Sequence, residues 1–160
     1  LGKTNLKGAK IFEASLQGAY GHKVMAEGAD FTKARVGGAN FGESIFKNLK
    51  GPGSVWAQAQ LFRADFSGAA LEEAIFSAAY LCQSRFAAAD LRRARMDEAN
   101  LRKATLIRIH FLQGSFQKAN LTSADLGEAN LFQAEFYGAI TKDASFQGAN
   151  IKRTLLAMQA

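Results

Sequence analysis

The hydrophobic pattern of this chain has a period of five residues. Reading every fifth position from Leu1, the residue is large and apolar at all but four places, which are Gly21, Ala26, Gly51 and Thr141. A second series, two residues before each of these centres, is mostly alanine. The phase does not slip anywhere in the 160 residues, so one structural unit of five residues is repeated along the whole chain.

This period fits neither an α-helix nor a straight strand. Five residues advance an α-helix by about 500°, which would spread the apolar positions around every face. In a strand, side chains alternate with a period of two, so successive centres would point to opposite faces unless the chain bends within every pentad. Regular corners are therefore required.

If each pentad forms one side and one turn, the chain closes after four sides with both series pointing inward. Only a small side chain fits beside a large one in so narrow an interior, which explains the alanines. The sequence thus predicts an all-β solenoid with about twenty residues per coil and about eight coils, and at most a short helical cap near 154–159. An Ala-rich helical bundle is the alternative, and it gives no reason for the strict phase.

A coil of this length places like side chains above one another. One predicted column holds Phe46, Phe66 and Phe86, and another holds Trp56 and Phe76. Ladders of this kind suit a solenoid in which each repeat contacts only its neighbours.

The short motifs around the centres resemble those of a known family. They read Ala-Asp-Phe at 29–31, Ala-Asn-Phe at 39–41, Ala-Asp-Leu at 89–91 and Ala-Asn-Leu at 99–101, and they are similar to the repeats of the pentapeptide-repeat family. The resemblance covers essentially the whole chain and implies a right-handed quadrilateral β-helix. The residues alone argue for four sides and leave the hand open.

The domain organisation expected is a single β-helix domain over residues 1–160, with irregular stretches near 21–26 and 48–55. Pro52 cannot donate a hydrogen bond to a ladder, so a bulge or a widened corner is expected at 51–53. Because the chain opens at Leu1 already inside a repeat, a fragment of a longer protein is one reading of it.

The composition does not decide in which cellular compartment the protein lies. No run of residues is long and apolar enough to span a membrane, and the start of the chain has no signal-peptide pattern. The single cysteine, Cys82, excludes a disulfide framework within the chain. A soluble protein is expected, with the cytoplasm favoured and a secreted effector or an organelle lumen as alternatives.

The residues capable of chemistry do not converge. His22 and His110 fall on different sides of the predicted coil, whereas a zinc site needs three or four convergent ligands. The adjacent carboxylates at 72–73 and 97–98 occupy outward corners, where solvated charge is the ordinary explanation. A packed interior also leaves no substrate cleft. We therefore expect no enzyme, no metal, no cofactor and no small-molecule substrate.

Charge points weakly to acidic partners. Twenty Lys and Arg residues against fourteen Asp and Glu residues give a net charge of +6. Seven cations between residues 85 and 108 are predicted to circle the rod as a belt, whereas a nucleic-acid track should run as a stripe with stacking aromatic rings. Nucleic-acid binding is disfavoured, and an acidic protein partner stays open.

Outward apolar residues are the most informative surface feature. Most outward positions are polar, which makes a small group of apolar ones unusual, and contiguous exposed apolar surface often marks a contact site. Scattered, tolerated apolar residues are the alternative explanation. The predicted protein-contact patch consists of Val55, Phe62, Ile75, Tyr80 and Cys82.

These observations favour a non-enzymatic scaffold whose flat outer faces bind another protein of unknown identity, or a second copy of the chain as a homodimer. The alternative comes from the resemblance, because quinolone-resistance members of the family bind DNA gyrase by imitating the shape and negative charge of duplex DNA. The net positive charge of this chain disfavours that alternative.

Overall fold

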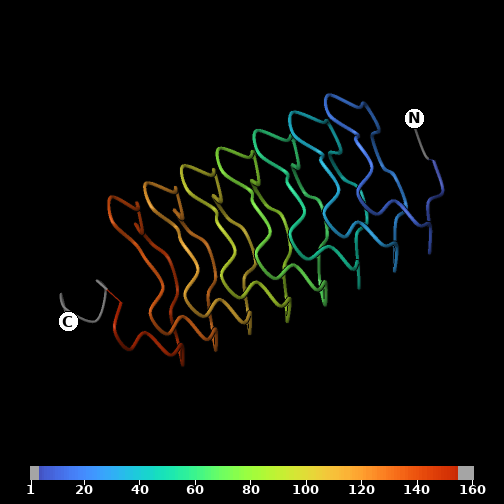
Figure 1. Ribbon diagram of the computed structural model, residues 1–160. Coiled ribbons are helices and arrows are strands. Elements are labelled where there is room, and N and C mark those ends of the chain that lie inside the picture. The colour runs from blue at the N-terminus through green and yellow to red at the C-terminus, as the bar shows by residue number, and fades with distance from the viewer. Residues whose placement is uncertain (1–3, 155–160) are drawn as a thin grey trace.

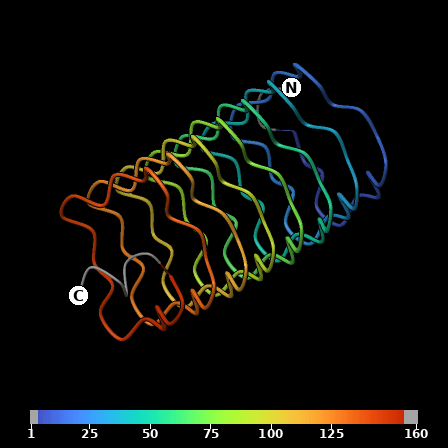
Figure 2. The ribbon, with the colours of Figure 1, turned by 60° about the vertical axis from the view of Figure 1, so that its left-hand side comes forward.

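The chain winds into a stack of similar coils. The computed structural model describes residues 4–154, and in this part the chain forms no helix and no longer strand. Its β-structure consists of single-residue parallel bridges at every fifth position, from Asn5↔Met25 to Asn130↔Asn150. Each bridge joins residues twenty apart, so four bridge columns define four sides. Figures 1 and 2 show the coils following one another along one axis from the N-terminal to the C-terminal end.

Four of the five backbone N–H groups in a pentad donate to backbone carbonyls. In the pentad 66–70, the first and third residues donate to the following coil, the fifth donates to the preceding coil, and the fourth closes the turn onto the first. The N–H of Ser67, the second residue, instead donates to Oδ1 of Asp65 at 3.0 Å. Every donor of the pentad is therefore satisfied, as an interior without water requires.

This contact explains why Asp or Asn so often precedes a centre. The side chain caps the one N–H group for which the coil offers no carbonyl, in an Asx turn. The residues that make this contact are Asn5, Asp30, Asn40, Asp65, Asp90, Asn100, Asn120, Asp125, Asn130 and Asn150.

The corner at 51–53 follows the regular pattern, so the predicted bulge is wrong. The N–H groups of Gly51 and Gly53 donate to the next coil, each at 2.8 Å, and Gly53 has a φ of 65°. A positive φ at the second central residue is the signature of a type II turn, whose first central position favours proline. Pro52 occupies the position whose N–H has no backbone partner, so proline there removes no hydrogen bond from the ladder.

Aromatic ladders fill the interior as the column pattern predicted. Phe66 is fully buried and stacks between Phe46 and Phe86, with centroid distances of 4.8 and 4.9 Å. Trp56 stacks on Phe76 in the neighbouring column at 5.9 Å, and rings of the two columns meet edge to face. The core is one continuous cluster along the rod.

The stretches 21–26 and 48–55 keep the regular backbone and exchange their core side chains. Leu49 replaces the usual alanine and is fully buried, while the neighbouring centre is Gly51. A Cβ atom on Gly51 would lie 2.7 Å from Cδ2 of Leu49. Val24 likewise replaces the usual alanine two residues before a small centre, Ala26, and a Cβ on the preceding centre, Gly21, would lie 2.8 Å from Cγ2 of Val24. In both stretches a larger side chain at the alanine position fills space beside a small centre. The single domain and the number of coils stay predictions, and the helical cap predicted near 154–159 lies outside the described residues apart from Thr154.

Replacing Phe66 by Asp should destabilise the protein by more than about 4 kcal/mol, because the substitution buries an unpaired charge between two rings. Arg102→Ala, at an exposed corner, should cost under about 0.5 kcal/mol. Urea unfolding of both variants measures the difference. Equal losses of unfolding free energy in the two variants would contradict the assignment of Phe66 to the interior and of Arg102 to the surface.

The exchange at 49 and 51 predicts a rescue. Leu49→Ala should leave a cavity and cost about 2–5 kcal/mol, and Gly51→Leu should overpack the same space. The double variant restores the usual small and large pair and should be more stable than either single variant. A double-mutant cycle of unfolding free energies tests this, and additive losses would contradict it.

The cap at Asp30 predicts a low pKa. The Thr32 hydroxyl donates to Asp30 Oδ1 at 2.6 Å and the Thr32 N–H at 3.0 Å, and with Lys50 nearby they lower the pKa of Asp30 from 3.8 to about 2. A lowered pKa stabilises the fold above pH 3.8, and this contribution is lost as the pH falls through about 2. In an NMR titration, Thr32→Ala should raise the pKa of Asp30, whereas Thr32→Ser should preserve it. An unchanged pKa in Thr32→Ala would contradict the role of the hydroxyl.

Candidate protein-contact surface

Phe62 and Tyr80 form an aromatic pair on the outside of the rod. Tyr80 lies in the middle of one side, and Phe62 lies at the next corner, one coil earlier. Their ring centroids are 6.4 Å apart, Tyr80 is 39% exposed, and Phe62 is half-buried. The Arg63 guanidinium lies 4.8 Å from the centroid of the Phe62 ring. Sequence reasoning grouped these two rings, and the structure brings them into contact.

Cys82 lies beside this pair and lines the same hollow. It lies at the corner directly above Phe62 in the stack, and only 9% of it is exposed. Its thiol donates a hydrogen bond to Oδ1 of Asn100 at 3.1 Å. The hydrogen bond between Tyr80 and Cys82 raises the pKa of the Tyr80 phenol. A small hollow of about 190 Å³ adjoins these side chains, and it is also lined by Gln83, Arg102 and Lys103.

Val55 and Ile75 lie on the adjacent side. They are bridged to each other one coil apart, and both are half-buried. The corner between them and the aromatic pair carries mostly short side chains, at Ala57, Ser77 and Ala78. A partner could therefore span the corner and touch both groups. The structure records no direct contact between Val55 or Ile75 and the aromatic pair.

Ion pairing divides the cations at 85–108 into two classes. They do lie on several sides of the rod, as the belt prediction required. On one of these sides, Arg92 and Arg93 bind carboxylates of Asp90 and Glu72 at 2.7 and 2.6 Å. The pKa of Asp90 is lowered, first by its hydrogen bond with Arg92. Within residues 4–154, no ion pair is recorded for Arg85, Arg102, Lys103 or Arg108.

The candidate chemical residues stay apart. His22 lies 3.6 Å from Glu43, and His110 occupies a bridge position on another side. Glu73 is 2.9 Å from Arg93, and Asp97 is 2.9 Å from Arg95, so the adjacent carboxylates serve as ion-pair partners. Among the described residues, no three metal-ligating side chains gather, and no helix has the length and apolar character to cross a membrane.

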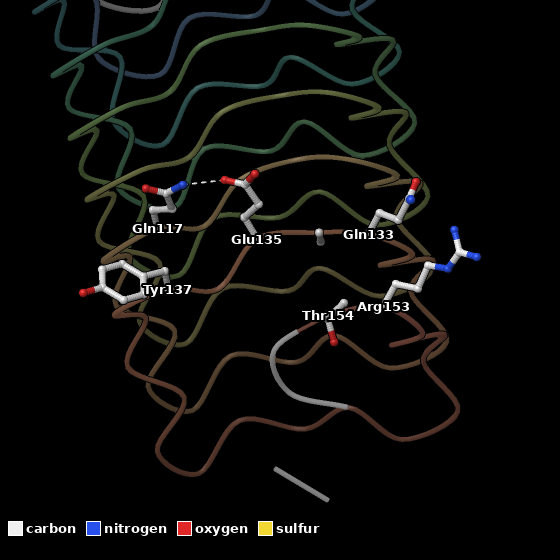
Figure 3. A pocket seen from close by; sticks show the side chains of 7 residues that line it. Gln117, Gln133, Glu135, Tyr137, Arg153 and Thr154 are labelled. Carbon is white, nitrogen blue, oxygen red and sulfur yellow. Dashed lines mark hydrogen bonds between the residues drawn. The ribbon is translucent and has the colours of Figure 1, made fainter. Parts of the chain in front are cut away.

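A further hollow lies near the C-terminal end of the described chain. It has a volume of about 460 Å³, and Figure 3 shows the side chains that line it. Glu135 is the one carboxylate among the described residues that line it and accepts a hydrogen bond from Gln117, while Tyr137 and Arg153 also line the hollow. The lining therefore contains no pair of carboxylates for acid and base catalysis.

Sequence reasoning missed the ion pairs, although a simple signal was present. Opposite charges twenty residues apart stack directly on one another, as Glu72 does with Arg92 and Asp30 with Lys50. Within residues 4–154, seven ion pairs follow this spacing: Lys7–Glu27, Glu13–Lys33, Lys23–Glu43, Asp30–Lys50, Glu72–Arg92, Glu73–Arg93 and Glu98–Lys118. A search at the coil period would have found them.

Four columns of bridges and a type II turn in every pentad define a quadrilateral β-helix of repeated pentapeptides. The chain belongs to the pentapeptide-repeat family, since the signature described as pentapeptide repeats matches in 8 copies over residues 52–77, 74–113 and 115–153. Its β-helix is therefore right-handed, as in the solved members of the family. A search of curated proteins found no match to the sequence.

The solved structure of HetL agrees with this fold. The chain is similar to HetL, a pentapeptide repeat protein involved in heterocyst differentiation regulation in the cyanobacterium Nostoc sp. strain PCC 7120, with 21% identity and a TM-score of 0.51 over 96% of this chain and 87% of HetL. A pentapeptide repeat protein of the Arabidopsis thaliana thylakoid lumen has 25% identity and a TM-score of 0.46, over 67% of this chain and 64% of its own. Full-length QnrB1, a plasmid-mediated fluoroquinolone resistance protein, has 19% identity and a TM-score of 0.41, over 93% and 70%.

Proposed function

We propose that this chain is a non-enzymatic scaffold that binds another protein through its outer faces. The contact surface consists of Phe62 and Tyr80, with the covered Cys82 beside them, and of Val55 and Ile75 on the adjacent side. The observation that carries the proposal is the outward-facing Phe62–Tyr80 ring pair at 6.4 Å, in which Tyr80 is 39% exposed and Phe62 half-buried, beside a small hollow. Aromatic side chains of this kind commonly dominate the binding energy of an interface.

The physical argument concerns what these side chains do for the fold. Neither Phe62 nor Tyr80 points into the interior, where the ladders are already complete without them. Other bridge positions on the side of Tyr80 hold polar residues such as Asn40 and Gln60 as well as Tyr20 and Ile140, so the fold does not require an aromatic side chain in this column. Apolar surface with no part in the core costs solubility, so a binding role accounts for it.

A DNA-mimicking role against DNA gyrase is the weaker candidate. A mimic must present negative potential to a basic groove, whereas this chain has a net charge of +6. The cations without an ion pair, such as Arg85 and Lys103, add positive charge to the surface next to the aromatic pair. No observation on the described residues favours the mimic.

The test uses Phe62→Ser/Tyr80→Ser. Sedimentation velocity over a concentration series should show self-association of the wild type that the double variant loses, if the partner is a second copy. If the wild type is monomeric, affinity purification should recover a partner that binds again after purification and is lost with the same variant. Thermal stability should stay nearly unchanged, since neither ring fills the interior.

The matched control is Tyr20→Ser/Tyr137→Ser, which removes two other aromatic side chains that are 63% and 68% exposed. This control should bind like the wild type. The proposal fails if Phe62→Ser/Tyr80→Ser keeps full binding, or if that variant unfolds and so shows the rings to be part of the core.

A further inference from the structure

A shallow groove runs along the side of the rod whose middle column carries Ile45, Asp65, Arg85 and Thr105. Its volume is about 740 Å³, and its walls include Lys47, Arg63 and Lys103 together with Glu43. We call this feature the basic groove. It shares Gln83 and Lys103 with the hollow beneath the aromatic pair, so the two surfaces meet at one corner of the rod.

Both carboxylates of the basic groove are already engaged. Asp65 is buried, with Oδ1 accepting hydrogen bonds from the N–H and hydroxyl of Ser67 and Oδ2 lying 3.6 Å from Lys47. Glu43 lies 3.5 Å from Lys23. Asp65 therefore caps its own turn, although it is bridged to Arg85 of the next coil.

The cations of the groove are less occupied. The Nε–H of Arg63 donates a hydrogen bond to Oε1 of Gln83 at 2.8 Å, and within residues 4–154 no carboxylate forms an ion pair with its guanidinium. Within residues 4–154, Arg85 and Lys103 take part in no recorded ion pair. Arg92 and Arg93, at the diagonally opposite corner, differ because they are bound to carboxylates. Of the four cations that line the basic groove, three therefore have no carboxylate partner among the described residues, whereas Arg102 and Arg108, which also have none, lie outside the groove.

The three cations come from successive coils. Register places Arg63, Arg85 and Lys103 one coil apart, which is about 4.8 Å per step along the rod. From the first to the third is about 10 Å, or the length of roughly three residues of an extended peptide. Two bridged apolar side chains, Met25 and Ile45, are exposed at the N-terminal end of the same side.

We propose that the basic groove binds an extended acidic segment of a partner protein, with carboxylates on alternate residues and an apolar residue at the end that meets Ile45. The carboxylates would accept hydrogen bonds from Arg63, Arg85 and Lys103, and charge-assisted bonds of this kind are stronger than neutral ones. This inference rests on the proposed scaffold function and names the chemistry of the partner.

A nucleic acid fits the groove less well. Each strand carries a phosphate about every 3.4 Å, so a strand along the groove would bring phosphates against Glu43 and Asp65. A peptide can place neutral residues at those two points. The groove itself is also lined by no aromatic residue on which a base could stack.

The experiment measures fluorescence anisotropy of a fluorescein-labelled peptide that has one leucine followed by alternating Glu and Ser, titrated with the full chain at low salt. Arg85→Ala/Lys103→Ala should weaken binding by about tenfold or more, since two charge-assisted contacts are lost. The matched control Arg92→Ala/Arg93→Ala removes the same charge from the corner diagonally opposite Arg63 and Lys103 and should change the affinity by less than about twofold. Arg85→Gln/Lys103→Gln, which keeps a polar side chain but removes the charge, should behave like the alanine variant.

Each other outcome overturns the inference. Equal loss in both alanine variants would mean that only net charge attracts the peptide, and absence of wild-type binding would mean that the groove takes no such segment. A labelled oligothymidine that binds more tightly than the peptide and responds to Arg85→Ala/Lys103→Ala would make the groove a nucleic-acid site. Failure here is distinguishable from failure of the scaffold proposal, because Phe62→Ser/Tyr80→Ser is judged by partner binding or self-association rather than by the peptide.

Discussion

The width of the interior is the constraint on which the rest of this structure depends. Four sides of backbone hold a fixed separation, so each coil has room for one large side chain beside one small side chain on every side. Leu49 and Gly51 obey this limit in reversed order, with 2.7 Å left between Leu49 and a Cβ on the glycine. An inserted residue would turn every following inward side chain outward, which explains why the phase never slips.

Backbone hydrogen bonding leaves most of the outer surface free. Because the ladders use four N–H groups of each pentad and an Asx side chain often uses the fifth, outward positions contribute little to the fold beyond that cap. Asp65 shows a consequence of the cap, since its Oδ1 accepts hydrogen bonds from Ser67, its Oδ2 lies 3.6 Å from Lys47, and it forms no ion pair with Arg85. A requirement of the turn thus helps to shape the charge of the basic groove.

The two proposed surfaces differ in the interaction they offer and meet at one corner. Phe62 and Tyr80 present aromatic area above a small hollow, whereas Arg85 and Lys103 present charge in a groove. Surface ion pairs contribute little to stability, but they decide which cations stay free to meet a partner. The net charge of +6 is therefore less informative than its distribution.

The sequence by itself determined the repeat, the four sides and the aromatic ladders, because a five-residue phase without slips has one closed solution with a small interior. It also identified the outward position of Phe62 and Tyr80. It failed at Pro52, where a turn position without a needed N–H accepts proline without a bulge. Only the tertiary structure decided that Cys82 is covered and that Arg85 lacks an ion pair, because both depend on side-chain directions between residues about twenty positions apart, which a linear pattern does not contain.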